Sequence, residues 1–99
     1  MRHVLAFHSQ GEEICWRYGE RTPARAEKMA QIFAASSGYS MEYPSGLASH
    51  GGFKDWFIDR FGRCGFTMEI GRGKNPLDPA ELDTIYERIE EIMMLAVIL

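Results

Sequence analysis

Cysteine is scarce in this 99-residue chain, and a long hydrophobic run is absent. Cys15 and Cys64 lie far apart and form no CxxC pair, so we expect reduced thiols rather than a disulfide framework or a thiolate metal site. No apolar run approaches the roughly 20 residues of a membrane span, and the opening residues turn polar too soon for a signal peptide. These absences predict a soluble chain without a membrane partner.

An excess of basic residues is also missing. The chain has 11 Lys and Arg against 14 Asp and Glu, which gives a net charge of −3, and no stretch concentrates the basic side chains. A phosphate-binding face requires such a concentration, so nucleic acid is not an expected partner. The length fits one domain over residues 1–99, built around a single core.

Strand and helix patterns alternate along the chain, which predicts the α/β class with three to four strands and three helices. Short apolar runs predict strands at residues 3–7, 14–18, 39–43 and 65–70. The first strand would end in a polar turn that starts at His8. Thr22 and Pro23 indicate the start of a helix that ends at Gly38, and residues 44–52 read as a loop.

Two further helices complete the pattern. The first of them carries aromatic residues on one side and ends at Gly62; an aromatic stripe at helical spacing is typical of core packing. Its aromatic residues are Phe53, Trp56, Phe57 and Phe61. The second begins at Asp78 and Pro79. Its predicted inner face consists of Leu82, Ile85, Ile89, Ile92, Met93 and Ala96.

The end of that last helix, from Ile92 to Leu99, reads IMMLAVIL and is apolar on every side. A surface helix keeps a polar face, so this segment needs a cover. The segment is too short to span a bilayer, which makes protein the expected cover. Three covers are open: the interior of this domain, a second copy, or an N-terminal part of the domain that this chain lacks.

Two polar residues at the ends of apolar strands are candidates for chemistry. His8 follows VLAF, and Glu69 follows FTM. Ligands of open α/β sheets gather beyond the strand ends, so the two side chains are candidates for one site. From the residues alone, a hydrogen-bonded structural role is the more common one for each of them, and their pairing favours a shared site only moderately.

The stretches AFHSQGEEI, SHGGFKDWF and FTMEIGRGKNP, in that order, closely resemble the C-terminal part of the zinc carboxypeptidase superfamily. More narrowly, they resemble its bacterial branch of γ-D-glutamyl-L-diamino acid endopeptidases, which cut peptidoglycan peptides. The resemblance covers almost the whole chain, but only about the last third of the family's catalytic domain. It implies a segment of a mixed-sheet zinc peptidase from the bacterial cytoplasm or cell wall.

The resemblance also implies roles for individual residues. His8 takes the place of the family's third zinc ligand, and Glu69 takes the place of the general base that accepts a proton from the zinc-bound water. Ser9 and Gln10 line the substrate cleft, and Arg72 is a candidate for a substrate carboxylate because its planar fork suits that partner. The expected substrate is a peptide containing γ-D-glutamyl-meso-diaminopimelate.

The chain departs from the family at the other metal ligands. The first two zinc ligands of the family come from an HxxE motif, and no histidine of this chain is followed by Glu three residues later. The family's mobile tyrosine also has no match at its expected position, where Tyr43 or His50 is a possible substitute. Glu12 and Glu13 read as candidates for the amino group of a diamino acid or as solvated carboxylates.

Two other functional hypotheses remain beside the peptidase segment. The first is a non-catalytic remnant or interaction module that keeps the fold and lacks the complete metal site. The second is a cysteine hydrolase that uses Cys15 or Cys64 with His8 or His50, although neither cysteine stands in a nucleophile motif.

Overall fold

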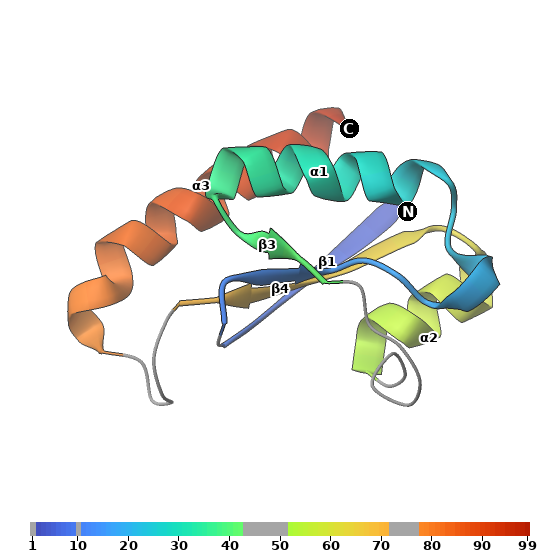
Figure 1. Cartoon of the computed structure of the whole chain (residues 1–99), viewed down its shortest axis with the longest axis horizontal. Helices are drawn as coiled ribbons and strands as arrows, with labels where there is room; N and C mark the ends of the chain where they lie inside the picture. Colours follow the sequence, from blue (N-terminus) through green and yellow to red (C-terminus); the bar gives the residue numbers. More distant parts are fainter. Residues whose placement is uncertain (1, 10, 43–51, 72–77) are drawn as a thin grey trace.

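The computed structural model describes residues 2–9, 11–42, 52–71 and 78–99 (Figure 1). Four strands and three α-helices make up the described part, which confirms the predicted α/β class. In chain order they are β1 (His3–Ser9), β2 (Glu13–Cys15), α1 (Arg25–Ser37), β3 (Ser40–Met41), α2 (Gly52–Phe61), β4 (Cys64–Ile70) and α3 (Leu82–Ile98). Short 3-10 helices at Gly19–Arg21 and Pro79–Glu81 precede α1 and α3.

The strands form one mixed sheet in the order β1-β4-β2-β3. β1 runs parallel to β4, β4 runs antiparallel to β2, and β2 runs parallel to β3. The β1–β4 pair is the longest, and its register aligns His3 with Cys64 and Ser9 with Ile70. The first and last strands of the chain are therefore neighbours, with β2, α1, β3 and α2 lying between them in sequence.

The helices cover the two faces of the sheet unequally. α1 and α3 lie together on one face, and α2 lies on the other (Figure 1). Alternate residues of β4 serve the two layers, since successive side chains of a strand point to opposite faces. Cys64, Phe66 and Met68 belong to the core under α1, whereas a Cβ on Gly65 would come within 3.3 Å of Ile58 in α2.

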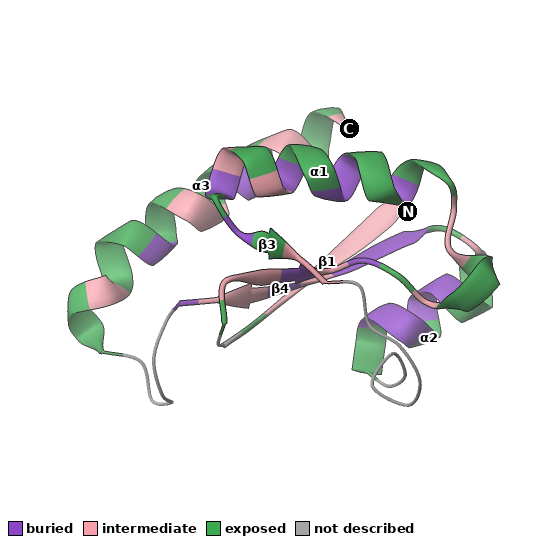
Figure 2. Ribbon diagram, in the orientation of Figure 1, coloured by how far each residue is buried: buried purple, intermediate pink, exposed green. Residues whose placement is uncertain are grey.

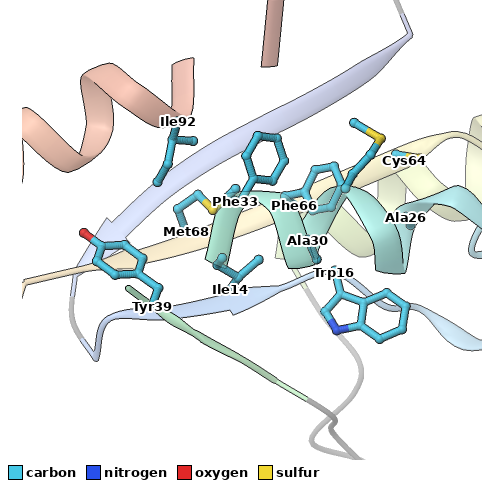
Figure 3. Close-up of a cluster of buried hydrophobic side chains, with 11 residues drawn as sticks. Ile14, Trp16, Ala26, Ala30, Phe33, Tyr39, Cys64, Phe66, Met68 and Ile92 are labelled. Carbon is cyan, nitrogen blue, oxygen red and sulfur yellow. The ribbon is translucent and has the colours of Figure 1, made fainter. Parts of the chain in front are cut away.

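The main core lies between the sheet and the α1–α3 layer (Figure 3). Phe33 of α1 meets Phe66 of β4 edge to face, with ring centroids 5.3 Å apart. Burying these two aromatic rings removes a large apolar area from water and so stabilises the fold. The cluster also contains Ile14, Trp16, Ala26, Met29, Ala30, Tyr39, Cys64, Met68 and Ile92.

The predicted strand ends differ from the observed ones. β1 continues through His8 and Ser9 because both residues keep their pairing with β4, so the turn predicted at His8 is wrong. β2 ends at Cys15 instead of residue 18, and β3 has only two residues. Tyr43 and residues 44–51 of the loop predicted over residues 44–52 lie outside the described residues, and Gly52 belongs to α2 instead of the loop.

α1 begins at Arg25, two residues after the predicted proline. The Thr22 hydroxyl accepts a hydrogen bond from the backbone N–H of Tyr18 and does not cap the helix. The predicted end is confirmed: Gly38 adopts the left-handed conformation at φ 79°, and its N–H donates to the carbonyl of Ala34.

The aromatic stripe of α2 is not core packing, contrary to the prediction. Phe57 is buried, but Phe53, Trp56 and Phe61 are each about half exposed (Figure 2). The face turned to the sheet carries Ile58 together with an ion pair between two buried neighbours, Lys54 and Asp55. This pairing takes up the sheet-facing positions and rotates the aromatic residues outward.

Fewer residues of α3 are buried than its sequence pattern predicted. Ile85 and Ile92 are buried, whereas Leu82 and Met93 are more than half exposed. α1 packs along only one side of α3, so the described part of the chain leaves much of the apolar end of this helix uncovered. None of the described helices is long and apolar enough to cross a membrane.

Candidate functional site

One row of residues crosses all four strands on the face opposite α1 and α3. The register pairs His8 with Glu69, Glu69 with Glu13, and Glu13 with Ser40. Directly paired residues of neighbouring strands project from the same face of a sheet. The row thus gathers His8, Glu69 and Glu13, three ionisable side chains from three different strands.

His8 and Glu69 are the two residues that sequence reasoning singled out. His8 is exposed and Glu69 is half-buried, and both stand near the carboxyl ends of parallel strands about 4.8 Å apart. Gln10 and Arg72 lie outside the described residues, and of Ser9 only the place at the end of β1 is described. The roles of these five residues stay predictions.

His3 does not belong to this row, although it is the other histidine of β1. It pairs with Cys64, and its Nε2 lies 2.7 Å from the carbonyl oxygen of Ala96 in α3. Five residues separate His3 from His8, so the alternation of the strand places the two rings on opposite faces. His3 is therefore no second metal ligand for a site at His8.

Next to the row, Glu13, Cys15 and Glu42 form a compact cluster. Each offers a ligand atom within 4.8 Å of the other two, and the Cys15 thiol donates to Glu42 Oε2 at 2.9 Å. The strand order explains this meeting, because Glu13 and Cys15 lie on one face of β2 while Glu42 follows β3. No other set of three or more such ligands is this close in the described part of the chain.

The carboxylates of this face repel one another. A hydrogen bond with Glu42, burial and the charges of Glu42 and Glu69 all raise the pKa of Glu13. Burial is the main cause that raises the pKa of the Cys15 thiol, followed by its hydrogen bond to Glu42. A nucleophilic cysteine needs a lowered pKa, so this environment argues against a cysteine hydrolase that uses Cys15.

Sequence reasoning missed Cys15 and Glu42 as members of this face. The signal was present at residues 13–15, where a buried Ile14 stands between two polar residues as in a half-buried strand. The strand was predicted to start at Ile14, so Glu13 was placed before it rather than in it. For Glu42, the meeting depends on pairing between distant strands, which no local pattern reports.

The described residues do not assemble the donor set that a catalytic zinc ion needs. A catalytic zinc ion requires three protein ligands and one open position. His8 offers one imidazole, and the cluster of Glu13, Cys15 and Glu42 does not include it. Among the described residues, the donor set therefore does not complete a catalytic zinc site.

Comparison with known proteins gives two relatives. The chain is 45% identical over 84 residues to gamma-D-glutamyl-L-diamino acid endopeptidase 1 of Lysinibacillus sphaericus, an alignment that covers 85% of this chain and 21% of the relative. It is 36% identical over 90 residues to the uncharacterized protein YqgT of Bacillus subtilis (strain 168), covering 91% of this chain and 24% of the relative. The chain thus spans about a fifth to a quarter of the length of the curated relatives it matches. No family model and no solved structure matches the chain.

Proposed function

We propose that this chain is a segment of a zinc-dependent metallopeptidase that hydrolyses γ-D-glutamyl-meso-diaminopimelate bonds of peptidoglycan peptides. The likeness to a named endopeptidase supports the reaction class. The observation that carries the proposal is the register of β1 and β4, which makes His8 and Glu69 direct partners on one face of the sheet. A metal ligand and a general base that share one water molecule must lie this close.

Glu69 acts as the general base in this proposal. Glu69 lies within β4 between His8 of β1 and Glu13 of β2, and its half-buried carboxylate accepts the proton in this proposal. His8 contributes one imidazole nitrogen to the metal. A zinc ion, when bound, lowers the pKa of a coordinated water to about 7. The remaining ligands come from outside the described residues, since the donor set above is incomplete.

Substrate contacts belong to the same end of the sheet. Ser9 and Gln10 follow His8 directly and line the cleft in this proposal, and Arg72 pairs with a substrate carboxylate. Glu13 stands beside Glu69 in the row. Its carboxylate suits the ammonium group of a diamino acid, because the surrounding carboxylates favour a cation there.

A chimera tests the proposal directly. This chain replaces the matched segment of the Lysinibacillus sphaericus endopeptidase, and hydrolysis of a γ-D-glutamyl-diamino acid peptide is measured with and without Glu69→Gln. We expect the chimera to hydrolyse the peptide and the variant to lose about 10²–10⁴-fold in kcat while it keeps its zinc, because the amide retains the shape but accepts no proton.

Two further variants sharpen the result. His8→Ala should lower the zinc content, whereas Glu87→Gln, an exposed change on α3, should alter neither zinc nor rate. A folded, zinc-loaded chimera without activity would favour the non-catalytic remnant. Full activity of the Glu69→Gln chimera would remove Glu69 from the mechanism.

A further inference from the structure

The connection between β1 and β2 crosses the end of another strand. β1 and β2 follow one another in the chain, but β4 lies between them in the sheet. Only residues 10–12 connect the two strands, so this short stretch spans the carboxyl end of β4 (Figure 1). The crossing therefore lies directly beyond Glu69, the last residue but one of β4.

Two backbone hydrogen bonds tie this crossing to the sheet. The N–H of Gly11 donates to the carbonyl of Gly71, the buried residue that follows β4, at 2.9 Å. The carbonyl of Glu12 accepts from the N–H of Ser40 in β3 at 3.0 Å. The crossing is thus anchored on both sides, at the end of β4 and at the start of β3.

The backbone of the crossing is strained at Glu12. This residue has φ 52°, and it is the one residue other than glycine with a positive φ in the part of the chain that the structure describes. A left-handed residue other than glycine persists only where its surroundings hold it, and such residues gather at functional sites. The hydrogen bonds of Gly11 and Glu12 supply that hold.

The crossing also lies against the side chain of Glu69. A Cβ built on Gly11 would come 4.0 Å from the Cβ of Glu69, which is ordinary van der Waals contact. Because Gly11 is also bonded to Gly71, it occupies the space beside Glu69 on the side of the strand end. His8 and Glu13 flank Glu69 on the neighbouring strands. The side chain of Glu69 therefore has fewer rotamers open to it than a residue at a free strand end.

We propose that Gly11 and Glu12 are positioning residues that hold the carboxylate of Glu69 in one orientation beside His8, an inference that rests on the proposed function, in which Glu69 is the general base. Gly11 and Glu12 act through Glu69, because their backbone restricts its side chain. A general base must be held within hydrogen-bond reach of the proton that it accepts, and a displacement of about 1 Å can lower the rate about 10²-fold.

Two substitutions of Glu12 separate the role of its backbone from that of its charge. Glu12→Thr and Glu12→Asn both remove the carboxylate, but only the β-branched threonine opposes a positive φ, which asparagine tolerates. In the endopeptidase chimera, kcat of Glu12→Thr should be about tenfold below that of Glu12→Asn, with equal KM and equal zinc content, because only the orientation of the base differs. Equal kcat values for the two variants would overturn the positioning role.

The orientation of Glu69 is measurable on the full chain without a metal or a substrate. Three-bond NMR couplings of its β protons report whether χ1 occupies one rotamer or several. We expect one rotamer in the unsubstituted chain and several in Gly11→Ala, because a side chain opposes the φ of 135° at that position. Several rotamers in the unsubstituted chain, or unchanged couplings in Gly11→Ala, would overturn the inference.

Gly19→Ala is the matched control for this measurement. Gly19 also has a positive φ, 51°, but nothing lies within 4 Å of a Cβ built there. Glu69 should therefore keep one rotamer in Gly19→Ala, and several rotamers in that variant would assign the effect to general loosening instead of the crossing. If Gly11→Ala does not fold, the couplings of Glu69 in the two Glu12 variants decide: several rotamers in Glu12→Thr alone support the inference, and equal couplings overturn it.

The kinetic and NMR measurements also separate this inference from the proposed function. An unsubstituted chimera without activity, or a Glu69→Gln chimera with full activity, overturns the proposed function and with it the catalytic purpose of the positioning residues. An active chimera in which Glu12→Thr and Glu12→Asn have equal kcat values overturns the positioning role alone.

Discussion

At the scale of single residues, the contact between Glu13 and Glu42 controls the electrostatics of the site face. Two carboxylates that share one hydrogen bond hold a proton more tightly than either does alone, which raises the pKa of Glu13. A carboxyl group whose pKa is raised on folding stabilises the protein fully below its unfolded value near 4.5. That contribution is lost as the pH rises through the folded value.

Glu42→Gln should therefore stabilise the protein at pH 7. The amide oxygen of the new Gln still accepts the hydrogen bond from the Cys15 thiol. Because the substitution removes one of the two carboxylate charges that repel each other, we expect a gain of about 0.5 kcal/mol in the free energy of unfolding. The gain should shrink as the pH falls to 4.5, and urea unfolding at several pH values measures it. Glu90→Gln, an exposed change on α3, is the control; an equal gain there would assign the effect to net charge.

The same substitution should make Cys15 more reactive. Glu42 contributes to the raised pKa of the thiol, both by its hydrogen bond and by its charge. Alkylation of Cys15, followed by mass spectrometry of the peptide that contains it, should be slow in the unsubstituted chain at pH 8 and faster in Glu42→Gln. An unchanged rate would mean that burial alone controls this thiol.

Lys54 and Asp55 form the buried ion pair of α2. Lys54 Nζ also donates to the carbonyl of Arg17 at 2.7 Å, so it ties the helix to the segment that follows β2. Lys54→Met leaves a buried carboxylate without its cation and should cost about 3 kcal/mol of stability in urea unfolding. Lys54→Met with Asp55→Asn should recover more than half of that loss; equal losses for the single and double variants would show that the charge is not the cause.

At the scale of elements, the end of α1 depends on one glycine. Gly38 has φ 79°, and a Cβ there would lie 2.8 Å from Nη1 of Arg88 in α3. Gly38→Ala should therefore cost about 1–2 kcal/mol in thermal or urea unfolding, from backbone strain and displacement of the arginine. Gly19→Ala, also at positive φ but with nothing within 4 Å, isolates the backbone part. A smaller loss at Gly38 than at Gly19 would contradict a role for Arg88.

The sequence predicted the ends of the helices better than it predicted which side of a helix is buried. The ends of α1 and α2 at Gly38 and Gly62 were recognisable because a glycine at positive φ is a local requirement of the helix end. The side chain of Asp78 accepts from the N–H of Ala80, so the predicted cap is present, but it opens the 3-10 helix Pro79–Glu81, and α3 itself begins at Leu82. Which side of α2 is buried was not predictable, because a buried ion pair competes with aromatic side chains for the sheet.

The candidate site was partly predictable for a related reason. His8 and Glu69 each follow an apolar run in the sequence, so their place near the ends of β1 and β4 was predictable. Their alignment with Glu13 depends on β2 entering the sheet beside β4, and the approach of Glu42 depends on β3. Three-residue and two-residue strands carry too little pattern to reveal these pairings.

At the scale of the whole molecule, the incomplete donor set predicts how the chain alone behaves. In the proposed site, His8 is one ligand where three are needed, so the purified chain should bind zinc weakly and should show no peptidase activity. Metal analysis after dialysis and a peptide hydrolysis assay measure this. Tight stoichiometric zinc would show that this chain completes a metal site, either with the cluster of Glu13, Cys15 and Glu42 or with another set of ligands. Glu13→Gln distinguishes the two cases, because this substitution removes the metal only if the cluster binds it.

The parallel pairing of β1 with β4 also has a consequence for synthesis on the ribosome. β1 emerges first, but its neighbour in the sheet follows only after β2, α1, β3 and α2 have been made. Loop closure over such a distance is slow, so both edges of an apolar seven-residue strand stay open during this interval. Until β4 has been made, the nascent chain therefore carries an apolar strand whose two edges are both unpaired, and its yield in the cell should depend on chaperones that shield residues 3–9.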